Sequence, residues 1–143
     1  VSGQAFFRTD NVLSNTKGIL NALKEYYAYP AKLPPMTWLS SAKPDAPYDL
    51  RAEKLANGKF QLKWDVKNKQ PRQTYNVYKC ETEDFNVDKG QNILAVGLQQ
   101  PVFEYQPLEN DKAYYYFITI SDAYHNESEK CIPAFFFHSR IIK

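Results

Sequence analysis

The spacing of apolar residues along the chain changes near Pro47. From Tyr48 onward apolar and polar residues alternate in short runs, which is the pattern of strands that bury one face. Asn57-Gly58 and other turn-forming residues separate these runs. We expect seven strands, over residues 48–52, 60–64, 75–80, 93–96, 102–105, 113–121 and 131–137. Seven short strands at this spacing predict a mainly β fold, a sandwich of two antiparallel sheets.

A helix is expected over residues 14–27, before the alternating region begins. Ser14 or Asn15 can cap its first turn, and Pro30 prevents its continuation. Its apolar side chains recur at three- and four-residue spacing and so share one face: Ile19, Leu20, Leu23, Tyr26 and Tyr27. We expect the stripe of Leu20, Leu23 and Tyr27 to be buried on the sandwich or on a second copy of the chain.

Residues 31–46 are rich in proline and are expected to form an extended linker. Met36, Trp38 and Leu39 supply apolar anchors, so we expect the linker to be packed down and not to swing free. Two interpretations of Trp38 stay open. It can form a wedge between two domains, which we favour because an exposed tryptophan is costly unless functional, or it can stack on a sugar ring.

The alternation also assigns side chains to the two faces of each strand. Trp64 has polar neighbours, so we expect it in the core and not on a sugar-binding surface. One face of the strand over residues 113–121 is expected in the core as well: Tyr114, Tyr116, Ile118 and Ile120. Three aromatic residues on neighbouring strands are expected to point away from the core: Tyr115, Phe117 and Phe136. Such a patch often marks an interface, and it is a candidate surface for docking on another domain or for carbohydrate.

Composition and charge exclude several classes of partner. Hydrophobic residues make up 43% of the 143 residues, which is enough for a packed core. The net charge is +2 and Lys and Arg do not cluster, so we expect no nucleic-acid partner and no anionic membrane surface. No apolar run approaches the roughly 20 residues of a membrane span, and residues 1–15 lack a secretory signal. Because the chain opens with Val, we expect it to be part of a longer protein.

Candidate chemistry is sparse. No Gly-rich phosphate loop, nucleophile elbow or set of paired metal ligands occurs in the sequence, so we expect no cofactor and no metal. His125 and His138 have no Ser, Cys or second His placed for a triad and are expected on the surface. Cys80 ends the third expected strand and Cys131 begins the last, and these strands run in the same direction on either side of a third. We therefore expect the two Cα atoms to lie beyond the roughly 7 Å limit for a disulfide, and both cysteines to be free.

Three segments of the expected sandwich resemble a fibronectin type III domain: PDAPYDL (44–50), LKWD (62–65) and YNVYK (75–79). Leu108 followed by Tyr114 is similar to that family's corner, where the tyrosine hydroxyl returns to the backbone. The segments TISD (119–122) and NES (126–128) resemble the versions appended to bacterial glycoside hydrolases. The resemblance covers most of the chain after Pro44. It implies an immunoglobulin-like sandwich that is not itself an enzyme.

The beginning of the chain resembles a different structure. The segment GQAFF (3–7), the helix over 14–27 and the segment YPAKLPPM (29–36) look like the last strand and helix of a (β/α)₈ barrel. The combination resembles the C-terminal end of a glycoside-hydrolase-like family ten protein of Bacteroidetes type, in which a barrel precedes the sandwich. This implies a barrel remnant over 1–30, a Pro-rich linker over 31–46 and a fibronectin type III-like sandwich over 47–143.

The resemblance also implies candidate substrate contacts in the parent protein. Barrel enzymes carry their active sites at the carboxyl ends of their strands, so Arg8, Thr9 and Asp10 would face substrate there. A solvated turn that leads into a helix is the simpler interpretation, and we favour it. No pair of carboxylates in the sequence has an obvious pocket-forming context, as glycoside hydrolysis requires.

These features predict a non-catalytic accessory module whose partner is the catalytic barrel of the same parent chain. Its role would be to pack on that barrel or to orient it. The resemblance implies a parent that acts on O-glycosyl bonds and that is secreted, periplasmic or a cell-surface lipoprotein. The alternative is a carbohydrate-binding module that uses exposed aromatic side chains.

Overall fold

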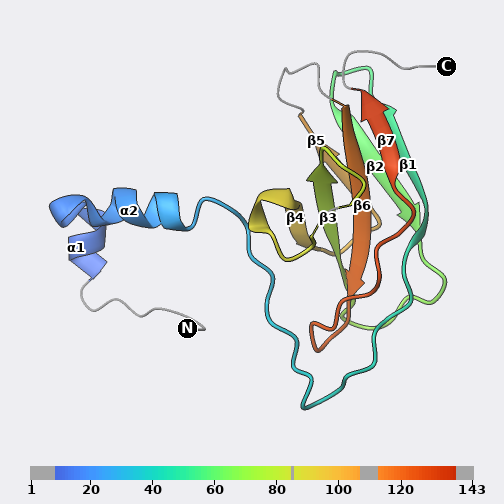
Figure 1. Cartoon of the computed structure of the whole chain (residues 1–143), viewed down its shortest axis with the longest axis horizontal. Coiled ribbons are helices and arrows are strands. Elements are labelled where there is room, and N and C mark those ends of the chain that lie inside the picture. The colour runs from blue at the N-terminus through green and yellow to red at the C-terminus, as the bar shows by residue number, and fades with distance from the viewer. Residues whose placement is uncertain (1–8, 85, 107–112, 138–143) are drawn as a thin grey trace.

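The alternating region folds into two antiparallel sheets that pack face to face (Figure 1). The computed structural model describes residues 9–84, 86–106 and 113–137. One sheet has the strand order β1-β2-β5, with β1 at Tyr48–Lys54, β2 at Phe60–Asp65 and β5 at Val102–Tyr105. The other has the order β4-β3-β6-β7, with β4 at Ile93–Leu98, β3 at Thr74–Cys80, β6 at Ala113–Ser121 and β7 at Ala134–Phe137. The predicted seven-stranded, fibronectin type III-like sandwich is confirmed.

The core lies between the two sheets and is built from the alternate residues that the sequence pattern assigned to it. It comprises Phe60, Leu62 and Trp64 of β2, Tyr75 and Val77 of β3, and Tyr114, Tyr116, Ile118 and Ile120 of β6. Trp64 is 2% exposed, and its ring meets that of Tyr75 edge-on with the centroids 5.3 Å apart. Trp64 Nε1 has no hydrogen-bond acceptor among the described residues, so this side chain stabilises the fold through apolar contact alone.

The outer face of the four-stranded sheet is also covered, which the sequence pattern did not predict. Phe117 is 0% exposed and packs with Tyr78, Cys80 and Ile93 in a second cluster, under Val87 of the loop that joins β3 to β4. The expectation that Phe117 forms an exposed patch is therefore wrong. Its side chain does point away from the inter-sheet core, but a loop lies over it.

The register of β7 corrects a second member of the expected patch. Residues directly opposite each other in antiparallel strands share a face of the sheet. Tyr115 lies opposite Phe135, whereas Phe136 lies opposite Tyr114, a residue of the core face. Phe135 therefore shares the face of Tyr115. Phe135 is 46% exposed, and its ring centroid lies 4.5 Å from that of half-buried Tyr115.

The expected helix is present, but it is interrupted. Helix α1 spans Thr9–Leu13, the 3-10 turn η1 spans Thr16–Gly18, and α2 spans Ile19–Tyr26. The break occurs at Asn15, Lys17 and Gly18, whose φ angles of 52°, 53° and 74° lie in the left-handed region. The N-cap of α2 is Gly18 and not the predicted Ser14 or Asn15. Asn15 lies before it, and its Oδ1 accepts hydrogen bonds from the backbone N–H groups of Leu20 and Asn21 at 2.9 and 3.3 Å, so it still supplies an acceptor to the first turn.

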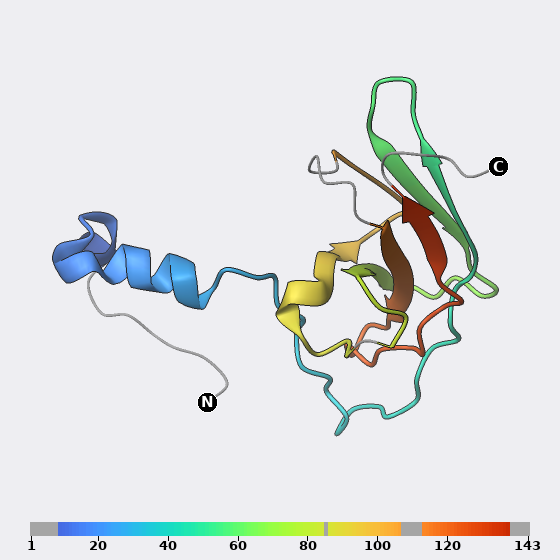
Figure 2. The ribbon, with the colours of Figure 1, turned by 45° about the horizontal axis from the view of Figure 1, so that its top comes forward.

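The helical segment projects away from the sandwich (Figures 1 and 2). No residue of α2 is buried, and Tyr27 is 54% exposed. The expectation that Leu20, Leu23 and Tyr27 are buried on the sandwich is therefore wrong, because the segment that carries them does not lie against either sheet. The alternative in that expectation, burial on a second copy, stays a prediction. No helix among the described residues is both long and apolar enough to cross a membrane.

The two tryptophans allow a matched test of the core. We expect Trp64→Ala to lower the free energy of unfolding by about 3–5 kcal/mol, because it leaves a cavity between the sheets. Trp38→Ala should change it by less than about 0.5 kcal/mol, because the Trp38 side chain is 76% exposed. Urea unfolding followed by far-ultraviolet circular dichroism measures both. Equal losses in the two variants would contradict this assignment of the core.

Candidate functional site

The linker, residues 31–46, is attached to the sandwich mainly by polar contacts. Met36 N–H donates to the carbonyl oxygen of Tyr124 at 2.8 Å, and the Asn126 side-chain amide donates to the carbonyl oxygen of Ser40 at 2.9 Å. Lys43 Nζ lies 2.8 Å from Glu129 Oε1. The prediction that the linker does not swing free is confirmed, but polar contacts hold it and not the expected apolar packing. The expected anchors Trp38 and Leu39 do not hold it, since they are 76% and 58% exposed.

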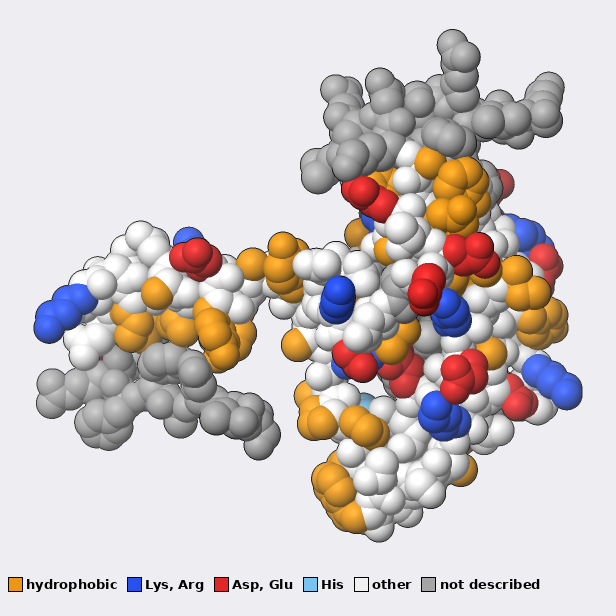
Figure 3. Space-filling model, in the orientation of Figure 1, with side chains coloured by type: hydrophobic (Ala, Val, Ile, Leu, Met, Phe, Trp, Pro, Cys, Tyr) orange, Lys and Arg blue, Asp and Glu red, His pale blue; other side chains and the backbone are white. Residues whose placement is uncertain are grey.

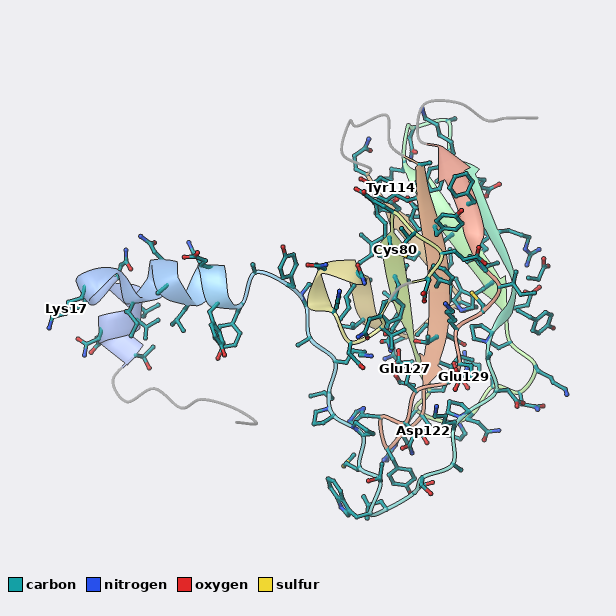
Figure 4. All side chains as sticks on the ribbon, in the orientation of Figure 1. Lys17, Cys80, Tyr114, Asp122, Glu127 and Glu129 are labelled. Atoms are coloured by element: carbon teal, nitrogen blue, oxygen red, sulfur yellow. The ribbon has the colours of Figure 1, made fainter. Side chains whose placement is uncertain are left out.

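Glu127 is the centre of this attachment. Its Oε1 accepts hydrogen bonds from Asn76 Nδ2 at 3.2 Å, from Thr119 Oγ1 at 2.5 Å and from the Tyr78 hydroxyl. Its Oε2 lies 2.6 Å from Nζ of Lys32 in the linker. The side chains of Glu127 and Lys32 are 18% and 19% exposed. We call these five residues the linker clamp; it joins β3, β6, the loop after β6 and the linker (Figure 4).

The loop that carries Glu127 is shaped by Asp122. One carboxylate oxygen of Asp122 accepts hydrogen bonds from the backbone N–H groups of Tyr124 and Asn126, each at 2.8 Å. The other accepts from the Asn126 side-chain amide at 3.0 Å. An aspartate that binds the backbone two residues ahead is a common device for holding a turn. It positions Glu127 over the outer face of the sheet.

The electrostatics of the linker clamp favour an ionised carboxylate. Burial alone would raise the pKa of Glu127, but hydrogen bonds from Lys32, Thr119 and Tyr78, with the positive charge of Lys32, outweigh it. The pKa of Glu127 therefore lies below its ordinary value. The pKa of the Tyr78 hydroxyl is raised, first by burial and then by its hydrogen bond to Glu127, so this group stays a proton donor. The clamp is thus an ion pair surrounded by neutral donors.

A groove of about 870 Å³ lies between the linker and this end of the sheet. Pro34 and Pro35 belong to one wall, and Asn76 and His125 lie on the sandwich side. The volume is suited to a small molecule. Its acidic groups are already engaged, however, because Glu127 binds Lys32 and Glu129 binds Lys43. Within the described residues no group of His, Cys, Asp and Glu could hold a metal ion.

The structure does not bring the predicted site residues together. Asp10 is exposed in α1, Trp38 is exposed in the linker, and Tyr115 lies on β6. His125, expected on the surface, is half-buried in the loop after β6 with φ 63°. Five residues or segments named in the sequence analysis lie outside the described residues: GQAFF (3–7), Arg8, Leu108, His138 and the side chain of Phe136. The proposed roles of Arg8, Asp10 and Trp38 stay predictions.

Sequence reasoning missed both charged members of the linker clamp. Lys32 and Glu127 are separated by 95 residues in sequence, so no local pattern links them. The one local signal is the polar run NES (126–128) after the longest strand. It contributes to the family resemblance, but it does not indicate which residue Glu127 contacts. Partially buried charges of opposite sign pair because each lowers the cost of burying the other.

Both cysteines are free and buried, as predicted. They lie on opposite faces of the four-stranded sheet, since Cys131 belongs to the inter-sheet core and Cys80 to the second cluster outside it. Cys80 lies opposite Tyr115 on β6, whereas the Cys131 N–H bonds the carbonyl oxygen of Ile118 at 3.0 Å. The two sulfurs are therefore separated in two ways. They lie on opposite faces of the sheet and at different positions along β6.

Comparison with known proteins supports the fold and a link to glycosyl hydrolases. No protein-family model matches the chain. It is 29% identical over 136 residues to a Bacillus subtilis protein named "Glycosyl hydrolase YngK". That match covers 90% of this chain and 26% of the relative, so the chain spans about a quarter of that protein's length.

Two solved structures share the fold. An Fn3-like protein from Clostridium thermocellum superposes with a TM-score of 0.51 and 19% identity, over 66% of this chain and 92% of that one. A structure described as a myokine superposes with a TM-score of 0.51 and 17% identity, over 68% of this chain and all of that one. At these identities the likeness concerns the fold alone. The covered shares are about equal to the share of this chain that residues 47–143 make up, which is about two thirds.

Glu127→Gln tests the linker clamp. At neutral pH we expect this variant to lose about 1–3 kcal/mol of unfolding free energy, because a neutral amide cannot pair with Lys32 or accept all four hydrogen bonds. The folded pKa of Glu127 is below the ordinary value of 4.5, so its stabilisation is present above about pH 4.5 and is lost as the pH falls through the folded pKa. Urea unfolding at pH 7 and pH 3 should show the difference between wild type and variant shrinking in acid.

Glu129→Gln is the matched control, since Glu129 and Lys43 have side chains 80% and 63% exposed. We expect it to be close to wild type at both pH values, because exposed ion pairs stabilise little. A Glu127→Gln variant as stable as wild type at pH 7 would contradict the clamp.

The cysteines give an independent test of the packing. Burial raises the pKa of each thiol, Cys80 and Cys131, to about 11. We expect both to react with a thiol reagent at once in denaturant and slowly in the native protein at pH 8, because the thiolate is the reactive form. Titration of free thiols with an absorbing disulfide reagent measures this. Failure to find two thiols in denaturant without reductant would indicate a disulfide and contradict the observed topology.

Proposed function

We propose that this chain is a non-catalytic module of a longer glycosyl hydrolase, in which the sandwich packs on and orients a catalytic barrel that precedes it. The observation that carries the proposal is a difference in coverage. The two fibronectin type III-like structures match 66% and 68% of the chain, whereas the protein named a glycosyl hydrolase matches 90%. A match of that extent includes the linker and most of the helical segment as well as the sandwich. The likeness to the hydrolase therefore concerns the whole arrangement.

The linker clamp supports an orienting role. A flexible spacer between domains is usually rich in Gly and Ser and makes few contacts. This linker is rich in Pro and is bound to the sandwich at Lys32, Met36, Ser40 and Lys43. The sandwich thus determines the path of the linker. It thereby also determines the place at which a preceding domain ends.

The carboxylates support a non-catalytic assignment for the sandwich. Glycoside hydrolysis normally uses two carboxyl groups about 5–10 Å apart across the scissile bond, and one of them must exchange a proton with the substrate. Glu127 and Glu129 border the groove, but each is paired with a lysine and each has a lowered pKa. Neither is suited to act as a general acid. We therefore assign the chemistry to the preceding domain.

The finer parts of the proposal follow the sequence resemblance. We assign residues 1–30 to the last strand and helix of the barrel. For Arg8 and Asp10 we favour a solvated position at the start of the helical segment, with contact to substrate as the alternative. We place the parent among glycoside-hydrolase-like family ten proteins of Bacteroidetes type, acting on O-glycosyl bonds. A secreted, periplasmic or lipid-anchored parent is part of the same proposal, because its substrate would lie outside the cytoplasm.

One observation favours a second function, carbohydrate binding. Trp38 is 76% exposed on a turn of the linker, and an exposed indole ring can stack on a sugar. A glycan array on the 143-residue chain separates the two functions. Binding that disappears in Trp38→Ala would favour carbohydrate recognition over a purely structural role.

Deletion of the sandwich tests the main proposal. In the longer polypeptide, removal of residues 47–143 should lower the melting temperature of the catalytic domain by about 3 °C or more, because it uncovers apolar surface. The 143-residue chain alone should not hydrolyse aryl glycosides. Scanning calorimetry and a chromogenic assay measure these outcomes. An unchanged melting temperature and unchanged activity after the deletion would refute the packing role.

A further inference from the structure

Exposed apolar side chains are concentrated in one short stretch of the chain. Nine large hydrophobic residues among those described are more than half exposed, and six of these lie between residues 26 and 39. We call them the 26–39 surface: Tyr26, Tyr27, Tyr29, Leu33, Trp38 and Leu39. In Figure 3 apolar side chains gather along the helical segment and again at the lower left of the sandwich. Apolar exposure of this kind marks an interaction site.

The 26–39 surface has the composition of a protein interface. Lys32 is the only charged residue between residues 26 and 39. Its ammonium group lies 2.6 Å from Glu127 and 3.4 Å from Asp88, so its charge is directed to the sandwich. Interface centres are depleted of charged residues and enriched in Tyr and Trp. The prolines of the same stretch reduce the entropy lost on binding, since the linker is already held in one path.

The tether to α2 is short, which limits where a partner can lie. Helix α2 ends at Tyr26, and three to four residues later the chain lies against the sandwich at Tyr29 and Pro30. A Cβ atom placed on Gly90 would be 3.1 Å from Tyr29 Cβ and 3.3 Å from the Pro30 carbonyl oxygen. Three residues span at most about 10 Å. The C-terminal end of α2 therefore lies within about 10 Å of the contact with the turn η2 (Gly90–Asn92), which adjoins the edge strand β4.

The other candidate docking face is less suitable. Tyr115 and Phe135 lie on β6 and β7, and β7 is at the opposite edge of the sheet from β4. Three strand spacings separate these edges, which is about 14 Å. Phe117 contributes nothing to that face, because it is 0% exposed.

We propose that the 26–39 surface, with the β4 edge beside it, is where the sandwich meets the barrel that precedes it in the longer polypeptide. Tyr26, Tyr27 and Tyr29 belong to the last helix of that barrel in the proposed function, and Leu33, Trp38 and Leu39 are the linker side chains that the barrel covers. The inference rests on the proposed function and adds the location of the contact. The occupant is the preceding domain, because the match to a protein about four times as long extends over this surface. The contact leaves the Tyr115–Phe135 face free.

Hydrogen exchange locates the contact. Backbone amides can be compared between the 143-residue chain and the longer polypeptide that carries it. Exchange over residues 31–39 should slow by about tenfold or more in the longer polypeptide, because packing suppresses local opening. Residues 19–30 are assigned to the barrel and do not discriminate, because they become protected when the barrel folds. Exchange over 113–119 and 134–137 should not change.

Each other outcome has a distinct meaning. New protection on β6 and β7 alone would overturn the inference but leave the packing role intact. No new protection on either surface would overturn the packing role as well. Protection of residues 31–39 that appears in the 143-residue chain alone and rises with concentration would identify a second copy as the occupant, and would overturn the inference.

Substitutions provide a second readout that does not depend on folding of the helix. In the longer polypeptide, Leu33→Ser and Trp38→Ser should each lower the melting temperature of the catalytic domain, whereas Phe135→Ser should not. In the 143-residue chain, Leu33→Ser and Trp38→Ser should leave the sandwich as stable as wild type, because both side chains are more than two-thirds exposed. A larger effect of Phe135→Ser than of Trp38→Ser on the catalytic domain would overturn the inference.

Discussion

The outer face of the four-stranded sheet carries polar side chains that are shielded from water, and the need to satisfy them constrains much of the molecule. Asn76 and Thr119 are 4% and 1% exposed. A buried polar group without a partner costs about 1–3 kcal/mol. Glu127 supplies the acceptor that Asn76 and Thr119 share, and its own charge requires a cation. That cation is Lys32, so the interaction that satisfies the sheet also attaches the linker to it.

In the proposed function, this coupling lets a small sandwich orient the domain that precedes it. Sheet-on-sheet packing around Trp64 stabilises the module by itself and needs nothing from the helical segment. The linker clamp then gives the chain one defined path from α2 to β1. Lys32 is the only charged residue between residues 26 and 39, and it pairs with Glu127 of the sandwich. The large side chains that this stretch exposes are therefore uncharged. The linker clamp therefore fixes the path of the same segment that exposes apolar side chains to solvent.

The groove beside the linker clamp shows why a carboxylate in a hollow is weak evidence for catalysis. Glu127 has both a shifted pKa and a groove position, the two properties often used to identify active sites. The pKa of Glu127 is lowered, however, because its hydrogen bonds and the charge of Lys32 stabilise the ionised carboxylate. A general acid needs the opposite shift. The direction and cause of the shift, and not its presence, indicate a structural role.

Local pattern was sufficient to predict most of the fold. Alternation in β2 and β6 identified Trp64, Tyr116 and Ile118 as core residues, because the two-residue repeat depends only on neighbouring positions. The same pattern does not tell whether the opposite face of a strand is exposed to water, and Phe117 is buried because a loop covers it. Nor does it set the register of β7, which places Phe135 opposite Tyr115.

Tertiary structure alone decided the linker clamp and the position of the helix. Lys32 and Glu127 are 95 residues apart in the sequence, and only the path of the linker across the sheet brings their charges together. The helix was predictable from its three- and four-residue spacing, but not its separation from the sandwich. Secondary structure follows from short-range sterics and periodicity, whereas pairing of distant charges and burial of outward faces depend on how complete elements pack.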